Sequence, residues 1–171
     1  MGEKMKVSKA SRRAKIIVLD DNREFAKSCI PLIREAIPRA DVFLCDSPCR
    51  AQSVGAKFHV DFVISNLDFG GEERKRLESF LTTHAELGAR IMLWSALEEV
   101  PKDFEQATKA VKIIFHNKQE GPEAFAEKLK ELRKLNPKPF AAGHLFHWAT
   151  SAEFLSKYHV APPRRSELCS A

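Results

Sequence analysis

The sequence lacks any apolar run near the ~18 residues that a membrane-spanning helix requires. The basic stretch of residues 1–15 is not followed by an apolar segment, which excludes a secretory signal peptide, and Lys6 breaks the myristoylation pattern that Gly2 would begin. Only four cysteines are scattered over 171 residues, which favours free thiols in a reducing compartment over a disulfide framework. We therefore expect a cytoplasmic protein with no membrane segment.

A basic surface is also missing, although the formal net charge is +5. Residues 1–15 carry six basic side chains and one acidic one, so this stretch accounts for the whole excess. The other residues hold 22 charges of each sign. A nucleic-acid-binding domain requires a basic patch on its folded surface. We therefore expect residues 1–13 to form a disordered basic tail and the rest to be an electrically balanced body.

What the sequence has is an alternation of short apolar runs and helical patterns. The apolar runs, each expected to be a strand, cover residues 15–19, 41–45, 61–65, 90–95 and 111–115. Helical spacing lies between them, with Pro31 expected to kink the first helix. Further helices are expected over 48–55, from Gly71 to about His84, over 101–109 and over 120–135, with Arg74, Lys75 and Arg76 on a solvated face. This pattern predicts an α/β fold with a doubly wound, five-stranded parallel sheet.

Beyond residue 135 the pattern changes. Asn136-Pro137-Lys138-Pro139 ends the last helix, and an aromatic segment follows, with Thr150 and Glu153 forming a capping box. We expect a C-terminal extension over 136–171, with a short helix at about 144–159 and a disordered end. It is too short to form a DNA-binding output domain with its own core. It either packs on the body or binds a partner or a second copy.

Polar residues gather where the predicted strands end, which is where doubly wound sheets place their functional sites. The first strand ends at Asp20-Asp21 and the third at Asn66-Leu67-Asp68-Phe69-Gly70-Gly71. The fourth ends at Ser95-Ala96, and the fifth at Phe115-His116-Asn117-Lys118. This set, in this order, resembles the receiver domain of bacterial two-component response regulators over residues 14–135. The resemblance implies a flavodoxin-like fold with strand order 2-1-3-4-5 and a role in phosphorelay signal transduction.

The family's chemistry assigns expected roles to these residues. In receivers an acid pair binds Mg²⁺, a carboxylate at the end of the third strand accepts a phosphoryl group, and a Ser/Thr and a Lys contact the phosphate. By resemblance, Asp21 and Asp20 with the carbonyl of Asp68 would hold Mg²⁺. The phosphate contacts would be Ser95, Ala96 and Lys118. The residues expected to couple the site to a partner surface are Phe115 and Trp94, and Trp94 is also a candidate core residue.

The departure from the family lies at the phosphoacceptor position, which Asn66 occupies. An amide is a poor nucleophile, and the loss of one carboxylate weakens a Mg²⁺ site. A second departure is Gln119, where receivers usually carry proline. The sequence therefore indicates a degenerate receiver, or pseudo-receiver, that is not an enzyme. Asn66 could also be an engineered or deamidation-related state.

Two alternatives remain open. Asp68 could serve as a displaced, Mg²⁺-dependent phosphoacceptor, although it lies past the strand end. A haloacid dehalogenase-like phosphatase is the weaker alternative, since the second acid of its D-x-D loop is here Asn22. As a receiver-like module, the protein would contact a histidine kinase, a phosphotransfer protein or another regulator. A homodimer would use the fourth helix, fifth strand and fifth helix, or the C-terminal aromatic segment.

Overall fold

The computed structural model describes residues 12–102, 104 and 113–135. The predicted C-terminal helix and nearly all of the predicted N-terminal tail lie outside these residues, as does most of the helix expected over 101–109. Arg12 and Arg13, which the sequence placed in the tail, instead form ion pairs with the body. Arg12 lies 2.8 Å from Asp61, and Arg13 lies 3.4 Å from Asp41.

Five parallel strands form one sheet in the order β2-β1-β3-β4-β5, which confirms the predicted topology. The strands are β1 (Lys15–Leu19), β2 (Asp41–Cys45), β3 (Phe62–Asn66), β4 (Arg90–Ser95) and β5 (Ile113–Asn117). All four pairings are parallel. β1, β3 and β4 are almost wholly buried because helices cover both of their faces.

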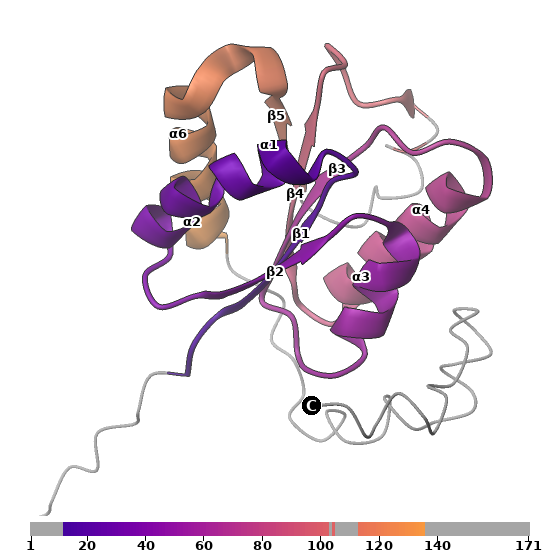
Figure 1. Cartoon of the computed structure of the whole chain (residues 1–171), viewed down its shortest axis with the longest axis horizontal. Coiled ribbons are helices and arrows are strands. Elements are labelled where there is room, and N and C mark those ends of the chain that lie inside the picture. Colours follow the sequence, from indigo (N-terminus) through magenta and orange to yellow (C-terminus); the bar gives the residue numbers. More distant parts are fainter. Residues whose placement is uncertain (1–11, 103, 105–112, 136–171) are drawn as a thin grey trace, which may run out of the picture.

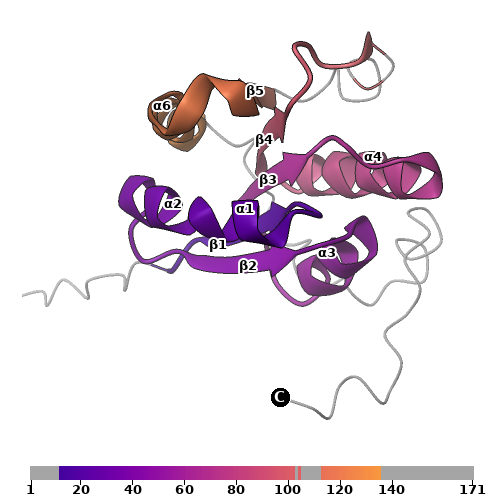
Figure 2. The ribbon, with the colours of Figure 1, turned by 45° about the horizontal axis from the view of Figure 1, so that its top comes forward.

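Two helical layers enclose the sheet (Figures 1 and 2). One layer holds α1 (Arg23–Ser28), α2 (Ile30–Ala36) and α6 (Gly121–Lys134), and the other holds α3 (Pro48–Gly55) and α4 (Gly71–Glu86). Each layer has its own core, with Trp94 and Phe125 in the first and Phe80 and Phe104 in the second. Among the described residues, no helix is long and apolar enough to cross a membrane.

Pro31 acts as the sequence predicts, since α1 ends at Ser28 and α2 begins at Ile30, with Pro31 in its first turn. The fifth strand differs from its prediction. It continues to Asn117 instead of ending at Phe115, because His116 and Asn117 pair in register with Trp94 and Ser95 of β4. A short 3₁₀ turn over Lys118–Glu120 then leads into α6.

Candidate functional site

The centre of the site is Asp20, the residue directly after β1. Its side chain is wholly buried, and its Oδ2 lies 2.7 Å from Lys118 Nζ. Its Oδ1 accepts a hydrogen bond of 2.8 Å from the backbone N–H of Asn22. Burial raises the pKa of Asp20, an effect that the ammonium group of Lys118 opposes. The carboxylate therefore sits in a low-dielectric position where its partner is Lys118.

Lys118 reaches this position from the 3₁₀ turn after β5. Asn117 fixes the start of that turn, because its Oδ1 accepts a hydrogen bond from the N–H of Gln119. The Lys118 ammonium lies 4.6 Å from the centre of the Phe25 ring and 5.6 Å from that of Trp94. Aromatic faces attract a cation, so two rings and one carboxylate together hold the lysine.

Asn66 is the last residue of β3 and is only 3% exposed. Its amide nitrogen donates a 3.1 Å hydrogen bond to Oδ1 of Asp21, which is otherwise an exposed residue. Its amide oxygen is buried and has no hydrogen-bond partner among the described residues. A buried polar atom without a partner is costly and needs an explanation.

Asp20, Asp21, Asn66 and Lys118 therefore meet at one edge of the sheet, as the sequence predicts. They are joined by the Asp20–Lys118 ion pair and the Asn66–Asp21 hydrogen bond. The two carboxylates and one ammonium leave a formal charge of −1. A third carboxylate in place of Asn66 would make it −2.

Ser95 and Ala96 do not take part in these contacts. Ser95 is fully buried at the end of β4, and its Oγ accepts a 3.1 Å hydrogen bond from the N–H of Leu97. Asn117 also binds this loop, with its Nδ2 3.3 Å from the carbonyl oxygen of Leu97. Ala96 is exposed. The Ser95 hydroxyl group therefore caps its own loop, and its contact with phosphate stays a prediction.

Asp68 lies two residues past the end of β3, and its side chain is exposed. Within the part of the chain that the structure describes, no group of three or more His, Cys, Asp or Glu side chains is placed to hold a metal ion. Both oxygens of Asp20 are already engaged, by Lys118 and by the Asn22 N–H. The donor set that the receiver resemblance implies for Mg²⁺ is thus partly occupied by the protein's own groups.

The two residues predicted to couple the site to a partner surface differ in position. Trp94 is 0% exposed and packs against Phe25 and Phe125, with ring centres 5.1 and 5.3 Å away. Trp94 is therefore a core residue, as the sequence also indicated, and is not itself exposed to a partner; its coupling role stays a prediction. Phe115 on β5 is half-buried and packs against the core on the α3–α4 side.

Sequence reasoning missed Phe25 and misplaced Arg74. Phe25 has a local signal, since Asn22 caps α1 by accepting from the N–H of Phe25, which fixes that residue beside the acid pair. Arg74 was expected on a solvated face, and Lys75 and Arg76 are indeed exposed. Arg74 turns inward instead: it donates a 2.8 Å hydrogen bond to the carbonyl oxygen of Leu67, and its guanidinium lies 4.7 Å from the ring centre of Phe104. Arg74 thereby links the loop after β3 to Phe104, which belongs to the core on the α3–α4 side.

The sheet order and layering define a doubly wound, flavodoxin-like α/β domain. Within that class, the chain is similar to solved receiver domains. A two-component transcriptional regulator AraC from Clostridium phytofermentans aligns with a TM-score of 0.60 at 15% identity, covering 71% of this chain and 93% of that one. The chemotaxis protein CheY4 of Vibrio cholerae gives 0.55 at 17% identity, over 71% and 99% of the two chains.

The signal receiver domain of an HD domain-containing protein from Pseudomonas fluorescens Pf-5 gives a TM-score of 0.53 at 14% identity, over 72% of this chain and 100% of that one. No protein-family model and no curated protein sequence matches the chain. The chain therefore has the receiver fold, and the expectation of that fold is confirmed.

Proposed function

We propose that this protein is an atypical receiver that transmits a signal through protein–protein contacts and is not phosphorylated in the usual way. The observation that carries the proposal is Asn66 at the end of β3, bonded through its amide to Asp21. Its place beside the acid pair and Lys118 corresponds to the acceptor position of the receiver fold. The partners of this role are a histidine kinase, a phosphotransfer protein or another regulator.

The chemistry of the amide supports the absence of phosphorylation. Aspartyl phosphate forms when a carboxylate oxygen attacks phosphorus, and a neutral amide lacks the charge that makes this oxygen nucleophilic. Lys118, which would neutralise charge on the phosphoryl oxygens, is instead paired with buried Asp20. The acceptor position therefore lacks a nucleophile, and the lysine that would assist transfer lies against Asp20.

The same residues argue for weak Mg²⁺ binding. Mg²⁺ prefers several hard oxygen ligands with a high negative charge. Asp21 and Asp20 supply two carboxylates, with Asp68 contributing a carbonyl by resemblance, but Lys118 already neutralises one of them. We expect Mg²⁺ affinity to be well below that of a site with a third carboxylate at position 66.

Intact-mass measurement before and after incubation with Mg²⁺ and acetyl phosphate tests the proposal. We expect no phosphoryl adduct on the native chain, and the untreated mass verifies that residue 66 is an amide. A stoichiometric, Mg²⁺-dependent adduct on the native chain would overturn the proposal. The displaced-acceptor alternative requires that adduct to disappear in Asp68→Asn, and the phosphatase alternative requires turnover of a generic phosphate ester.

Asn66→Asp is the gain-of-function variant. It restores a carboxylate and raises the negative charge of the site, so we expect both a phosphoryl adduct and Mg²⁺ affinity about tenfold or more above the native chain. Asn66→Asp/Asp21→Asn is the matched control, because it keeps the new carboxylate and the original net charge but removes the direct metal ligand. If Asn66→Asp stays unmodified while the fold is intact, the pocket has lost more than its acceptor.

A further inference from the structure

A hollow lies away from the candidate site, along the outer edge of β2. It has a volume of about 520 Å³. We call this hollow the β2 edge groove. Its lining comes from β2, from the chain before β1 and from the α2–β2 region: Arg13, Arg34, Arg39, Ala40, Asp41, Val42 and Phe43. Polar and apolar groups both border this groove, which therefore has the mixed character of a peptide-binding surface.

Among the strands that the structure describes, β2 is terminal in the sheet and pairs only with β1 (Figure 2). The Asp41 N–H bonds to the carbonyl of Ala14, and the Cys45 carbonyl accepts from the N–H of Asp20, so these residues face β1. In a strand the alternate residues face the other way, so the backbone groups of Val42 and Leu44 point outward. Such an edge is a template for an added strand.

The side chains of this edge are unusually accessible for a parallel sheet. Four of the five residues of β2 are only half-buried, whereas β1, β3 and β4 are almost completely buried. Val42 and Leu44 lie toward the α1–α2 layer and Phe43 toward the α3 layer. Natural proteins protect such strands with charge. At this edge, the charged side chains that have no ion-pair partner among the described residues are arginines.

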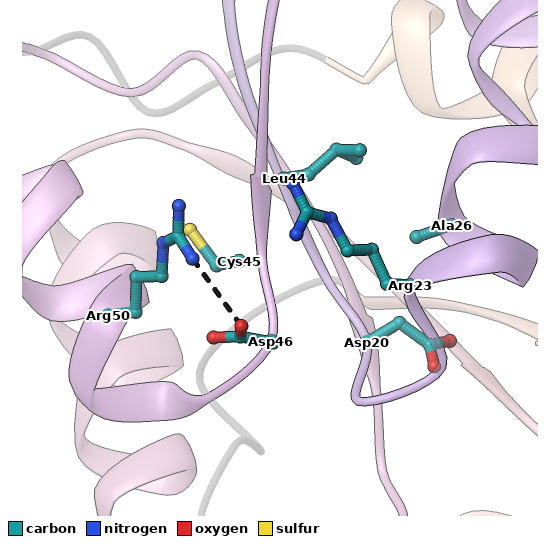
Figure 3. Close-up of a pocket in the computed structure, with 7 residues that line it drawn as sticks. All are labelled: Asp20, Arg23, Ala26, Leu44, Cys45, Asp46 and Arg50. Atoms are coloured by element: carbon teal, nitrogen blue, oxygen red, sulfur yellow. Dashed lines mark hydrogen bonds and ion pairs between the residues drawn. The ribbon is translucent and has the colours of Figure 1, made fainter.

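Arginines border the edge along its whole length. Arg34 and Arg39 make no hydrogen bond or ion pair with any described residue, whereas Arg13 is 3.4 Å from Asp41. At the other end of β2, Arg23 extends beside Leu44 while Arg50 reaches Asp46 on the opposite side of the strand (Figure 3). Unpaired guanidinium groups next to open backbone groups favour an acidic, extended occupant.

Arg39 adds a conformational observation. Its φ is +62°, which makes it the one non-glycine residue in the left-handed region among the described residues. An arginine there is uncommon and costs free energy that glycine or asparagine would avoid. An arginine at this strained position of the groove rim supports a binding role for its guanidinium group.

We propose that the outer edge of β2 docks an extended acidic segment of a partner protein, which adds to the sheet as a sixth strand with its carboxylates over Arg34 and Arg39. A second copy of this chain fits poorly, since edge-to-edge pairing would bring like-charged arginines together. Duplex nucleic acid would not use the outward backbone groups of Val42 and Leu44. The inference specifies where a partner binds in the interaction role proposed above, but its test does not depend on phosphorylation.

The probe is a fluorescein-labelled peptide of alternating Glu and Val, measured by fluorescence anisotropy against the full chain. Two comparison peptides share its length: alternating Lys and Val, and the Glu-Val peptide with an N-methyl group on every residue. A heparin fragment serves as a generic polyanion. We expect binding by the Glu-Val peptide alone among the peptides. The N-methylated peptide keeps the charge but cannot pair with a strand edge, so it separates strand addition from plain charge attraction.

The variant Arg34→Gln/Arg39→Asn removes both unpaired charges, and asparagine suits the left-handed backbone at residue 39. We expect peptide affinity to fall about tenfold or more, with folding unimpaired. The matched control is Lys75→Gln/Arg76→Gln on α4, which removes the same charge from the opposite layer and should change affinity less than about twofold. Backbone amide NMR should show the shifts centred on Val42 and Leu44.

Three results would overturn the inference. The Glu-Val peptide fails to bind, or it binds both double variants equally well, or the N-methylated peptide and heparin bind as tightly as the unmodified peptide. Dimerisation of the native chain that is lost in a Val42→Lys variant would assign the edge to a second copy instead. None of these outcomes bears on the phosphoryl adduct, so the two proposals fail separately.

Discussion

Lys118 and His84, which lie on opposite faces of the sheet, have opposite kinds of surroundings. On the α1–α6 face, the Lys118 ammonium lies 2.7 Å from Asp20 and faces the Phe25 ring. On the α3–α4 face, His84 is 4% exposed and packs against Phe80, with ring centres 4.5 Å apart. Burial lowers the pKa of His84 to about 3, so this imidazole stays neutral.

The difference follows from what each face has to do. Gly55 of α3 packs so closely on His84 that a Cβ added to this glycine would lie 2.6 Å from the imidazole Nε2. His84 is thus closely packed against α3, and a neutral side chain suits this packing role. The α1–α6 face instead opens at the strand ends, where a charged pair remains beside an exposed Asp21. The Lys118–Asp20 ion pair thus lies at the candidate site, whereas His84 is buried in the packing of α3 on α4.

Breaking the ion pair should have the largest effect. Lys118→Met leaves a buried carboxylate without its cation, and removal of one partner of such a pair costs about 3–5 kcal/mol. Burial already raises the pKa of Asp20, so ionised Asp20 is less favourable in the folded chain than in the unfolded chain. The loss in free energy of unfolding caused by Lys118→Met should therefore be greatest at neutral pH and become smaller as Asp20 is protonated in acid.

Urea unfolding of the native chain and the variant between pH 7.5 and pH 4.5 measures this. Lys118→Met/Asp20→Asn, which removes both charges, is the control and should recover most of the lost stability. A deficit that is independent of pH would show that Lys118 acts by packing alone.

Acid should destabilise the α3–α4 face through His84. The unfolded chain takes up a proton near the ordinary histidine pKa of 6.5, while the folded chain does so only near pH 3. Stability contributed by neutral His84 is therefore complete above pH 6.5 and is lost as the pH falls toward 3. From pH 6.5 to pH 5 the loss should be about 2 kcal/mol at 1.36 kcal/mol per pH unit.

His84→Gln should flatten this dependence in urea unfolding followed by circular dichroism. His59→Gln is a suitable control because burial lowers the pKa of His59 too, but that side chain is 18% exposed and lies near Asp61. His59→Gln should reduce the pH dependence of the free energy of unfolding much less than His84→Gln does. An unchanged slope in His84→Gln would mean that acid unfolding begins elsewhere.

The smallest expected effect sharpens the description of the charged face. Phe25→Leu keeps an apolar side chain but removes the ring that faces the Lys118 ammonium, which should cost about 0.5–1 kcal/mol beyond the lost packing. The measurement is a double-mutant cycle with Lys118→Met at pH 7.5. Strict additivity of the two substitutions would contradict a direct interaction between the ring and the ammonium.

The sequence was sufficient to predict the sheet, because β1, β3 and β4 are continuous apolar runs and Pro31 marks the break after α1. It was also sufficient to predict that the acid pair, Asn66 and Lys118 lie together at the carboxyl ends of the strands, since parallel strands end on the same side of the sheet. It could not predict that Arg74 turns inward or that Ser95 caps its own loop. Those outcomes depend on local hydrogen-bond partners that become apparent only in three dimensions.

The interruption between α1 and α2 has a dynamic consequence. α1 is fastened to the site through the Asn22 cap and Phe25, whereas α2 is fastened to α6, with Arg133 bonded to the Ala36 carbonyl. A continuous helix would convey any change in the site along its whole length. Because the two helices are separated at Cys29 and fastened to different elements, we expect α1 and α2 to exchange their amide hydrogens at separate rates.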